Sequence, residues 1–224
     1  MKVFKLTDNV GKTRSNTQWG ENISHTAKGN DTKLCSNGWI HYYTHPLLAV
    51  LLNPIHVSFT YPKLWEAEAS GEIINEALKS GCKTLMTIKE IPLPEISRVQ
   101  RIVFGILCAK EVCKDEVWNK WADKWLSGED RSEKSARAAR ADASLSDDAY
   151  AANASYAASY AARAAARAAN AAIASNAAAA DAAAYASNAA ADAAAAAADA
   201  AAADSDFDES INFIELAEKA MTYK

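Results

Sequence analysis

Residues 161–203 read AARAAARAANAAIASNAAAADAAAYASNAAADAAAAAADAAAA, and this stretch decides the fold. It belongs to an alanine-rich tract that begins near residue 136, and neither glycine nor proline follows Gly128. Alanine is the strongest helix former because its side chain loses no entropy in a helix. The tract therefore predicts helix in almost any surroundings. Its composition offers no nucleophile, metal ligand or phosphate-binding loop, so we expect a role in assembly or spacing.

The other residues of the tract follow a regular pattern. Tyr156, Tyr160, Arg163 and Arg167 step by three and four, and a similar series resumes at Asp181. The mean step of about 3.5 residues is typical of coiled coils. The opposite side carries alanine at two positions in every seven, which allows two helices to approach closely. We expect this alanine seam to mediate oligomerisation through Ala151, Ala154, Ala158, Ala161, Ala165, Ala168, Ala172, Ala179, Ala182 and Ala186.

A physical reason favours pairing of this helix. An isolated alanine helix is only marginally stable in water. Its arginines also precede its aspartates, which is the unfavourable order for the helix dipole. Antiparallel pairing would set Arg163 and Arg167 opposite Asp181 and Asp192. Pairing within the chain and pairing with a second copy both satisfy this pattern, and we expect a homo-oligomer.

The rest of the chain predicts an ordinary globular core. All six tryptophans lie before residue 126, and extended segments are expected at Trp39–Tyr43 and Ile55–Phe59. A helical pattern begins at Pro94. The predicted fold is an α+β N-terminal domain at 1–130, followed by a long Ala-rich helical tail, coiled-coil-like and close-packed, at 131–206. A short amphipathic helix is expected at 207–224.

Composition excludes several classes of function. The net charge is −4 and the acidic excess lies after residue 130, which disfavours nucleic acid as a partner. We find no signal peptide and no transmembrane segment, so we expect a cytoplasmic protein without a membrane partner. The four cysteines form no C-x-x-C pair, which predicts reduced thiols. We expect no cofactor and no metal.

Polar and aromatic residues of the N-terminal region form the candidate site. His41 and His45 are four residues apart and His56 follows, but their spacing matches no metal site. Glu66 and Glu68 alternate along an expected strand, so both carboxylates would share one face. Paired carboxylates can divide acid and base roles, and the same E-x-E spacing occurs in arginine-directed ADP-ribosyltransferases. If a ligand pocket exists, we expect it among Trp39, His41, Tyr43, His45, His56, Glu66 and Glu68.

Several short motifs carry a resemblance. They include Leu34-Cys35, His45-Pro46, Asn53-Pro54-Ile55-His56, Ile91-Pro92-Leu93-Pro94-Glu95 and the run Trp125–Arg131. In these motifs, over roughly residues 1 to 135, the chain resembles uncharacterised phage and prophage proteins that join a small domain of unknown function to an alanine-rich tail. The resemblance brings no catalytic residues with it.

The resemblance implies a phage-encoded accessory protein that acts in the bacterial host cytoplasm. We expect an anti-defence binding protein rather than an enzyme, and we expect it to oligomerise through its alanine-rich helix. It would sequester a host defence protein or its small nucleotide signal. Two alternatives stay open. One is an enzyme of ADP-ribosyltransferase type using Glu66 and Glu68, and the other is a structural phage component with a helical spacer.

Overall fold

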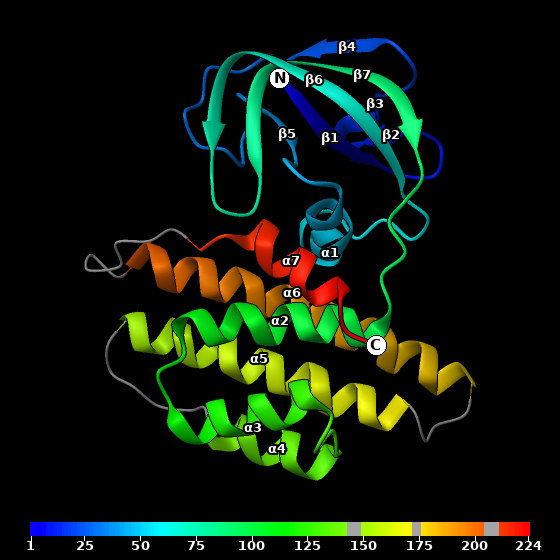
Figure 1. Cartoon of the computed structure of the whole chain (residues 1–224). Helices are drawn as coiled ribbons and strands as arrows, with labels where there is room; N and C mark the ends of the chain where they lie inside the picture. The colour runs from blue at the N-terminus through cyan, green and yellow to red at the C-terminus, as the bar shows by residue number, and fades with distance from the viewer. Residues whose placement is uncertain (143–148, 172–175, 204–210) are drawn as a thin grey trace. The chain divides into compact units, whose positions relative to one another are not determined.

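The computed structural model describes residues 1–142, 149–171, 176–203 and 211–224 (Figure 1). The chain folds as two compact units, Met1–Glu95 and Ile96–Lys224, which we call unit 1 and unit 2. Among the described residues, no helix combines the length and the apolar character needed to cross a bilayer.

Unit 1 is built on an antiparallel sheet. Its strands are ordered β1 (Lys2–Thr7), β6 (Lys63–Asn75), β7 (Ser80–Ile91) and β4 (Ile23–Thr26). Strand β5 (Ile40–Tyr42) also pairs with β7, beside its first residues. A separate small hairpin joins β2 (Lys12–Thr13) to β3 (Thr17–Gln18) through a 3-10 turn at Arg14–Asn16.

The sheet of unit 1 closes on itself. Phe4 of β1 and Tyr43, directly after β5, exchange two backbone hydrogen bonds of 2.8 Å. Because β5 pairs with β7 and its continuation meets β1, the strands curl into a small barrel (Figure 1). The main cluster of its core is formed by Val3, Trp19, Tyr42, Ala67, Ala69, Cys82 and Leu85.

One lysine is buried with these apolar residues. Lys5 is 8% exposed, and its ammonium donates a 2.6 Å hydrogen bond to the His41 carbonyl. The same nitrogen lies 5.1 Å from the centroid of the Trp19 ring. Burial lowers the pKa of Lys5 from 10.5 to about 8, because the low-dielectric interior disfavours the charged form.

Helix α1 (Pro46–His56) corrects one expectation from the sequence. The strand expected at 55–59 is wrong, since Ile55 and His56 complete this helix. Five consecutive buried residues, Leu48–Leu52, anchor the helix, and Pro46 begins it in the first turn, where its missing N–H costs nothing. The alternation of apolar residues after Pro54 imitates a strand pattern.

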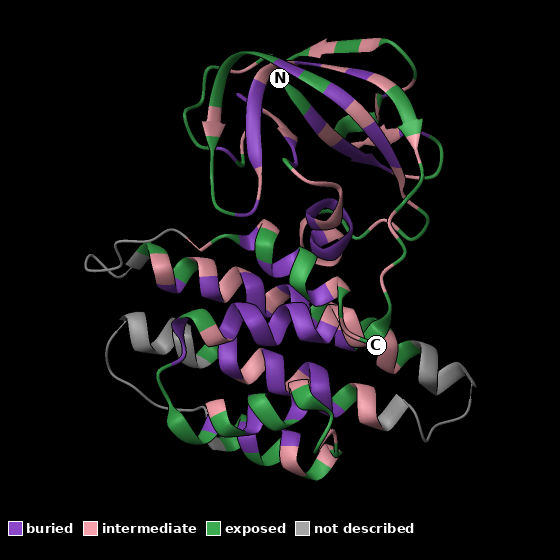
Figure 2. Ribbon diagram, in the orientation of Figure 1, coloured by how far each residue is buried: buried purple, intermediate pink, exposed green. Residues whose placement is uncertain are grey.

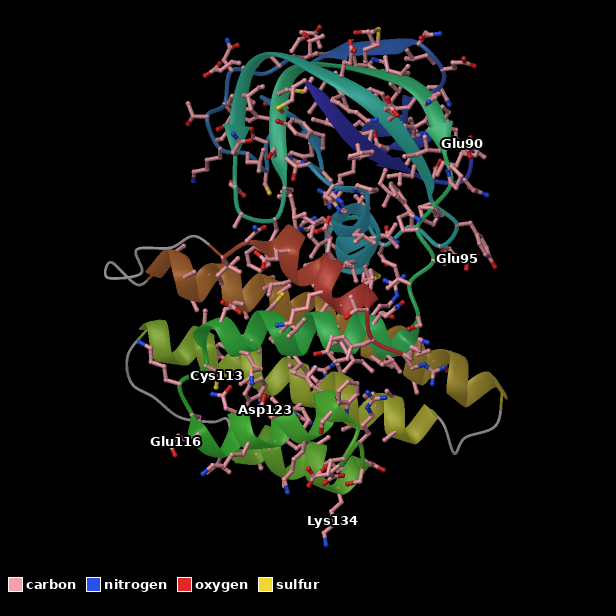
Figure 3. The ribbon with its side chains drawn as sticks, viewed as in Figure 1. Glu90, Glu95, Cys113, Glu116, Asp123 and Lys134 are labelled. Atoms are coloured by element: carbon pink, nitrogen blue, oxygen red, sulfur yellow. The ribbon has the colours of Figure 1, made fainter. Side chains whose placement is uncertain are left out.

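Unit 2 is helical. In order along the chain its helices are α2 (Arg98–Val112), α3 (Glu116–Ser127), α4 (Glu133–Asp142), α5 (Ala149–Ala171), α6 (Asn176–Ala203) and α7 (Phe213–Met221). Local signals set their ends: Ser97 and Gln100 form a capping box before α2, and Gly128 ends α3 with a φ of 82°. Lys110 of α2 forms an ion pair with Asp123 of α3, and Asp123 is labelled in Figure 3.

Helix α2 is the centre of unit 2. Residues Ile102–Ala109 are all buried, and α2 packs against both α5 and α6 (Figure 2). At Gly105, helices α2 and α6 come very close together. A Cβ atom added to Gly105 would lie 3.0 Å from the Cα and the carbonyl oxygen of Ala190 in α6. Further along, the Trp118 indole of α3 donates a 3.0 Å hydrogen bond to the Ala158 carbonyl of α5. The alanine-rich helices α5 and α6 thus pack against the larger side chains of α2 and α3.

The expected coiled-coil-like tail is wrong. The structure is a mixed α and β fold, and the alanine-rich tract contributes helices of short to moderate length to unit 2. The tract pairs within the chain, where α5 packs against α6. The physical reason is the apolar surface of α2, which alanine methyl groups can cover at close range. Helices α2 and α3 lie in the same compact unit as the tract, since the two units divide after Glu95.

Several residues of the expected alanine seam are buried inside unit 2. Ala158, Ala161, Ala165 and Ala186 are buried, and Ala168 and Ala182 are half-buried. Their contacts are made within one chain. Ala172 and the side chains of Ala151, Ala154 and Ala179 lie outside the described residues, as does the expected boundary at 206.

Candidate functional site

Two of the candidate histidines, His41 and His56, make hydrogen bonds to other segments of unit 1. The His41 Nε2 atom on β5 lies 2.5 Å from the Leu34 carbonyl oxygen. The His56 Nδ1 atom, at the end of α1, lies 2.9 Å from the Tyr43 hydroxyl, and the two rings stack with centroids 5.8 Å apart. Each imidazole therefore uses one ring nitrogen in an internal contact.

Electrostatics keeps both rings neutral. Burial lowers the pKa of His41, and it lowers that of His56 to about 4. The charge of Lys79 acts in the same direction on both histidines. The Lys79 amine also donates a 3.0 Å hydrogen bond to the Cys35 thiol. At neutral pH the two imidazoles are uncharged polar groups that anchor a loop and a helix end.

The other aromatic and histidine candidates also have local roles. His45 is the N-cap of α1, and its Nδ1 accepts a 3.3 Å hydrogen bond from the Leu47 amide. Trp39 is 8% exposed and is covered by Lys83, whose amine lies 4.1 Å from the ring centroid. Burial raises the pKa of the Tyr43 hydroxyl, so it stays protonated.

Glu66 and Glu68 lie on β6 beside lysines. The Glu66 carboxylate is 3.0 Å from the Lys2 amine and 4.0 Å from that of Lys89. Glu68 is exposed and stands opposite Lys2 in the β1–β6 register. The two glutamates therefore share one face of β6, and the structure brings neither of them to the candidate histidines by any hydrogen bond or ion pair among the described residues. In the described parts of the chain, no three His, Cys, Asp or Glu side chains gather as metal ligands would.

A hollow in unit 1 lies at residues that the sequence did not single out. Its volume is about 450 Å³, and it is lined by Asp8, Asn9, Ser58, Phe59, Thr60 and Tyr61. Three large apolar side chains are exposed in the two loops that form it: Tyr61 at 75%, Val10 at 59% and Val57 at 36%. We call the hollow and these three side chains the loop site.

Both loops of the loop site are fixed by side-chain hydrogen bonds. The Asp8 carboxylate accepts from the Val10 amide at 3.0 Å and from the Lys12 amide at 2.6 Å. The Asn53 side chain donates to the Phe59 carbonyl at 2.9 Å and accepts from the Phe59 amide at 3.0 Å. The Asn53 carbonyl accepts a further 2.6 Å bond from the Ser58 amide. The apolar groups are thus exposed on a preorganised backbone.

The chemistry of the loop site is that of an interface. Asp8 is the one charged side chain among the described residues that line the hollow. Its carboxylate already accepts two backbone hydrogen bonds, which leaves exposed aromatic and aliphatic groups beside polar loop atoms. Such a surface has room and apolar contacts for an apolar side chain, and its described lining residues lack the lysine or arginine that a phosphate group requires.

A turn signal could have found this site from the sequence. Asp8-Asn9-Val10-Gly11 is a turn sequence that contains an exposed valine, and Ser58 adopts a φ of 54° within another apolar run. The strand interpretation of 55–59 concealed the second loop.

Comparison with protein-family models, with curated protein sequences and with solved structures finds no match for this chain. The proposals below therefore depend on the residues and their geometry, together with the resemblance noted in the sequence.

Proposed function

We propose that this chain is a binding protein that sequesters a bacterial host protein by burying an apolar side chain of that protein at the loop site. The observation that carries the proposal is the exposure of Tyr61, Val10 and Val57 around the hollow on two fixed loops. Large apolar side chains that gather at the surface mark interaction sites. A preorganised backbone adds affinity, because little entropy is lost when the partner docks.

The loop site favours a protein over a small nucleotide as the partner. A nucleotide needs cationic groups for its phosphates, and the charged group that lines the hollow is acidic. The candidate histidines are already bonded inside unit 1, and Lys83 covers the Trp39 ring. The phage origin, the anti-defence role and the host cytoplasm come from the resemblance over residues 1 to 135, and they remain part of this proposal.

Capture from a bacterial lysate tests the proposal. The wild-type chain is compared with Val10→Asp and with Tyr61→Ala, and captured proteins are quantified by mass spectrometry. The matched control is Val117→Asp, since Val117 of α3 is 61% exposed, close to the 59% of Val10. We expect one or more proteins to be captured by the wild type and the control and to be reduced about tenfold by each loop-site variant. Equal capture by all four chains would refute the loop site.

A further inference from the structure

The exposed face of α5 and α6 carries a second kind of surface. On α5, Tyr156 is 59% exposed and Arg167 is exposed, while Tyr160 and Arg163 of the same stripe are half-buried. On α6, Tyr185 is 51% exposed, and the exposed or half-buried polar residues are Asp181, Asn188, Asp192 and Asp199. The spacings of three and four residues place each set on one side of its helix.

Contacts between the helices show that the two stripes lie side by side. The Arg167 guanidinium lies 5.4 Å from the Tyr185 ring centroid. Burial raises the pKa of Asp192 and the charge of Arg163 lowers it, which places these groups within electrostatic reach of each other. The two stripes thus form one continuous surface, which we call the charged face.

The charged face divides its charges between the helices. The sequence of α5 holds Arg163 and Arg167 and no acidic residue, whereas that of α6 holds three aspartates and no basic residue. Helices α5 and α6 are antiparallel, because Arg163 is near Asp192 while Arg167, further along α5, contacts Tyr185, earlier in α6.

We infer that the charged face binds a second copy of this chain in a two-fold dimer. A two-fold axis that runs parallel to the helices and midway between them places α5 of each copy over α6 of the other. Each residue then faces the partner residue that lies beside it in its own chain, so Arg163 faces the partner's Asp192 and Arg167 faces the partner's Tyr185. The relation is reciprocal, as an isologous interface requires. Each helix also meets an antiparallel helix, so the helix dipoles are arranged favourably.

The size of the face suits a dimer. The described side chains of the face lie on residues 156–169 of α5 and 181–202 of α6, about 21 and 33 Å of helix at about 1.5 Å per residue. Over these lengths two helices about 10 Å apart present on the order of 550 Å², against the roughly 800 Å² per partner of a standard interface. Tyrosine and arginine are also the residues that most often dominate binding energy.

This dimer differs from the one expected from the alanine seam. Four described alanines of the seam, Ala158, Ala161, Ala165 and Ala186, are buried in unit 2, where α5 and α6 pack against α2 and against each other. Association through the charged face leaves that packing intact. The inference is independent of the loop site, because it concerns the purified chain alone.

Sedimentation velocity of the purified full chain tests the dimer. Arg167→Asp reverses the exposed cation of α5 and leaves Arg163 and Asp192 unchanged. The matched control is Lys134→Asp, which makes the same charge change at an exposed residue of α4 (Figure 3). We expect a dimer for the wild type and the control. For Arg167→Asp we expect a dimer dissociation constant at least about tenfold higher.

A second variant completes the test. Asn188→Arg adds a cation to α6 near Arg167, so we expect it to weaken the dimer as well. An equimolar mixture of Arg167→Asp and Asn188→Arg should form a heterodimer, because the new aspartate of one copy faces the new arginine of the other. A monomeric wild type, a dimer that both variants leave unchanged, or a mixture that does not reassociate would overturn the inference.

Discussion

The buried amine of Lys5 makes the free energy of unfolding of unit 1 change with pH between about 8 and 10.5. The folded chain releases the Lys5 proton near pH 8 and the unfolded chain near 10.5. Between these values the unfolded chain binds more protons, so the free energy of unfolding rises with pH. At about 1.4 kcal/mol per pH unit, the full effect is about 3 kcal/mol. Below pH 8 this amount is the cost of burying the charge.

The perturbation that tests this is Lys5→Met, which keeps the length of the side chain and removes its charge. At pH 7 the variant should regain about 3 kcal/mol and lose about 1 kcal/mol with the hydrogen bond to the His41 carbonyl. We therefore expect Lys5→Met to be more stable than the wild type by about 2 kcal/mol at pH 7. The advantage should disappear by pH 10.5, where the folded wild-type amine is neutral and only half of the unfolded amine still carries its charge.

The assay must separate the two units. Urea unfolding of chains labelled with 5-fluorotryptophan, followed by fluorine NMR, does so because Trp19, Trp39 and Trp65 report unit 1. Burial also raises the pKa of Cys82 to about 11, which lowers stability between pH 9 and 11. The charge of Lys5 lowers the pKa of Cys82, so the two chains are compared in a Cys82→Ala background, which removes this contribution from both. A difference that is the same at pH 7 and pH 10.5, or a variant less stable at pH 7, would refute the reasoning.

Three further predictions concern single residues. Gly105→Ala should destabilise unit 2 by about 1–3 kcal/mol, because the new methyl group meets the Ala190 backbone at 3.0 Å; the unit 2 tryptophan signals in the same urea assay measure it. Acidification should destabilise unit 1 between pH 6.5 and about 4, by up to about 3 kcal/mol, because the unfolded chain protonates His56 first; His56→Phe should flatten this pH dependence. Glu68→Gln should leave lysate capture and folding unchanged, whereas an enzyme that uses Glu66 and Glu68 would lose its effect in cells.

The sequence predicted the helical tract well and its packing poorly. Alanine content and the absence of proline and glycine after Gly128 are local properties, so they determine helix formation directly. The coiled-coil step of about 3.5 residues was read as a sign of a separate tail. The pattern contains no information about the position of α2. The buried residues Ile102–Ala109 belong to this helix, which packs against both alanine-rich helices, α5 and α6. Tertiary contacts of this kind have no periodic signature.

The candidate site shows a similar division. Polar residue types drew attention to His41, His56 and Glu66, yet the structure pairs each of them with a neighbour within unit 1. Residues that look reactive in a sequence can be satisfied internally, because buried polar groups need partners. Apolar residues in turns look unreactive in a sequence, yet they can form a binding surface when they are exposed. Val10 and Tyr61 attract no notice in a list of chemical groups, but their exposure is costly unless something covers them.

The two proposed surfaces make different demands on the chain, and this explains its construction. The loop site requires rigid loops, which the closed sheet and the Asp8 and Asn53 hydrogen bonds supply. The charged face requires straight helices without bulky side chains between them, which the alanine tract supplies. If both proposals hold, Val10→Asp should reduce capture about tenfold without changing the dimer, and Arg167→Asp should weaken the dimer without changing capture at the loop site. A dimer also presents two loop sites. A host protein with repeated subunits could then bind both sites, and after the first site binds, the second binds at a raised effective concentration that a monomer cannot provide.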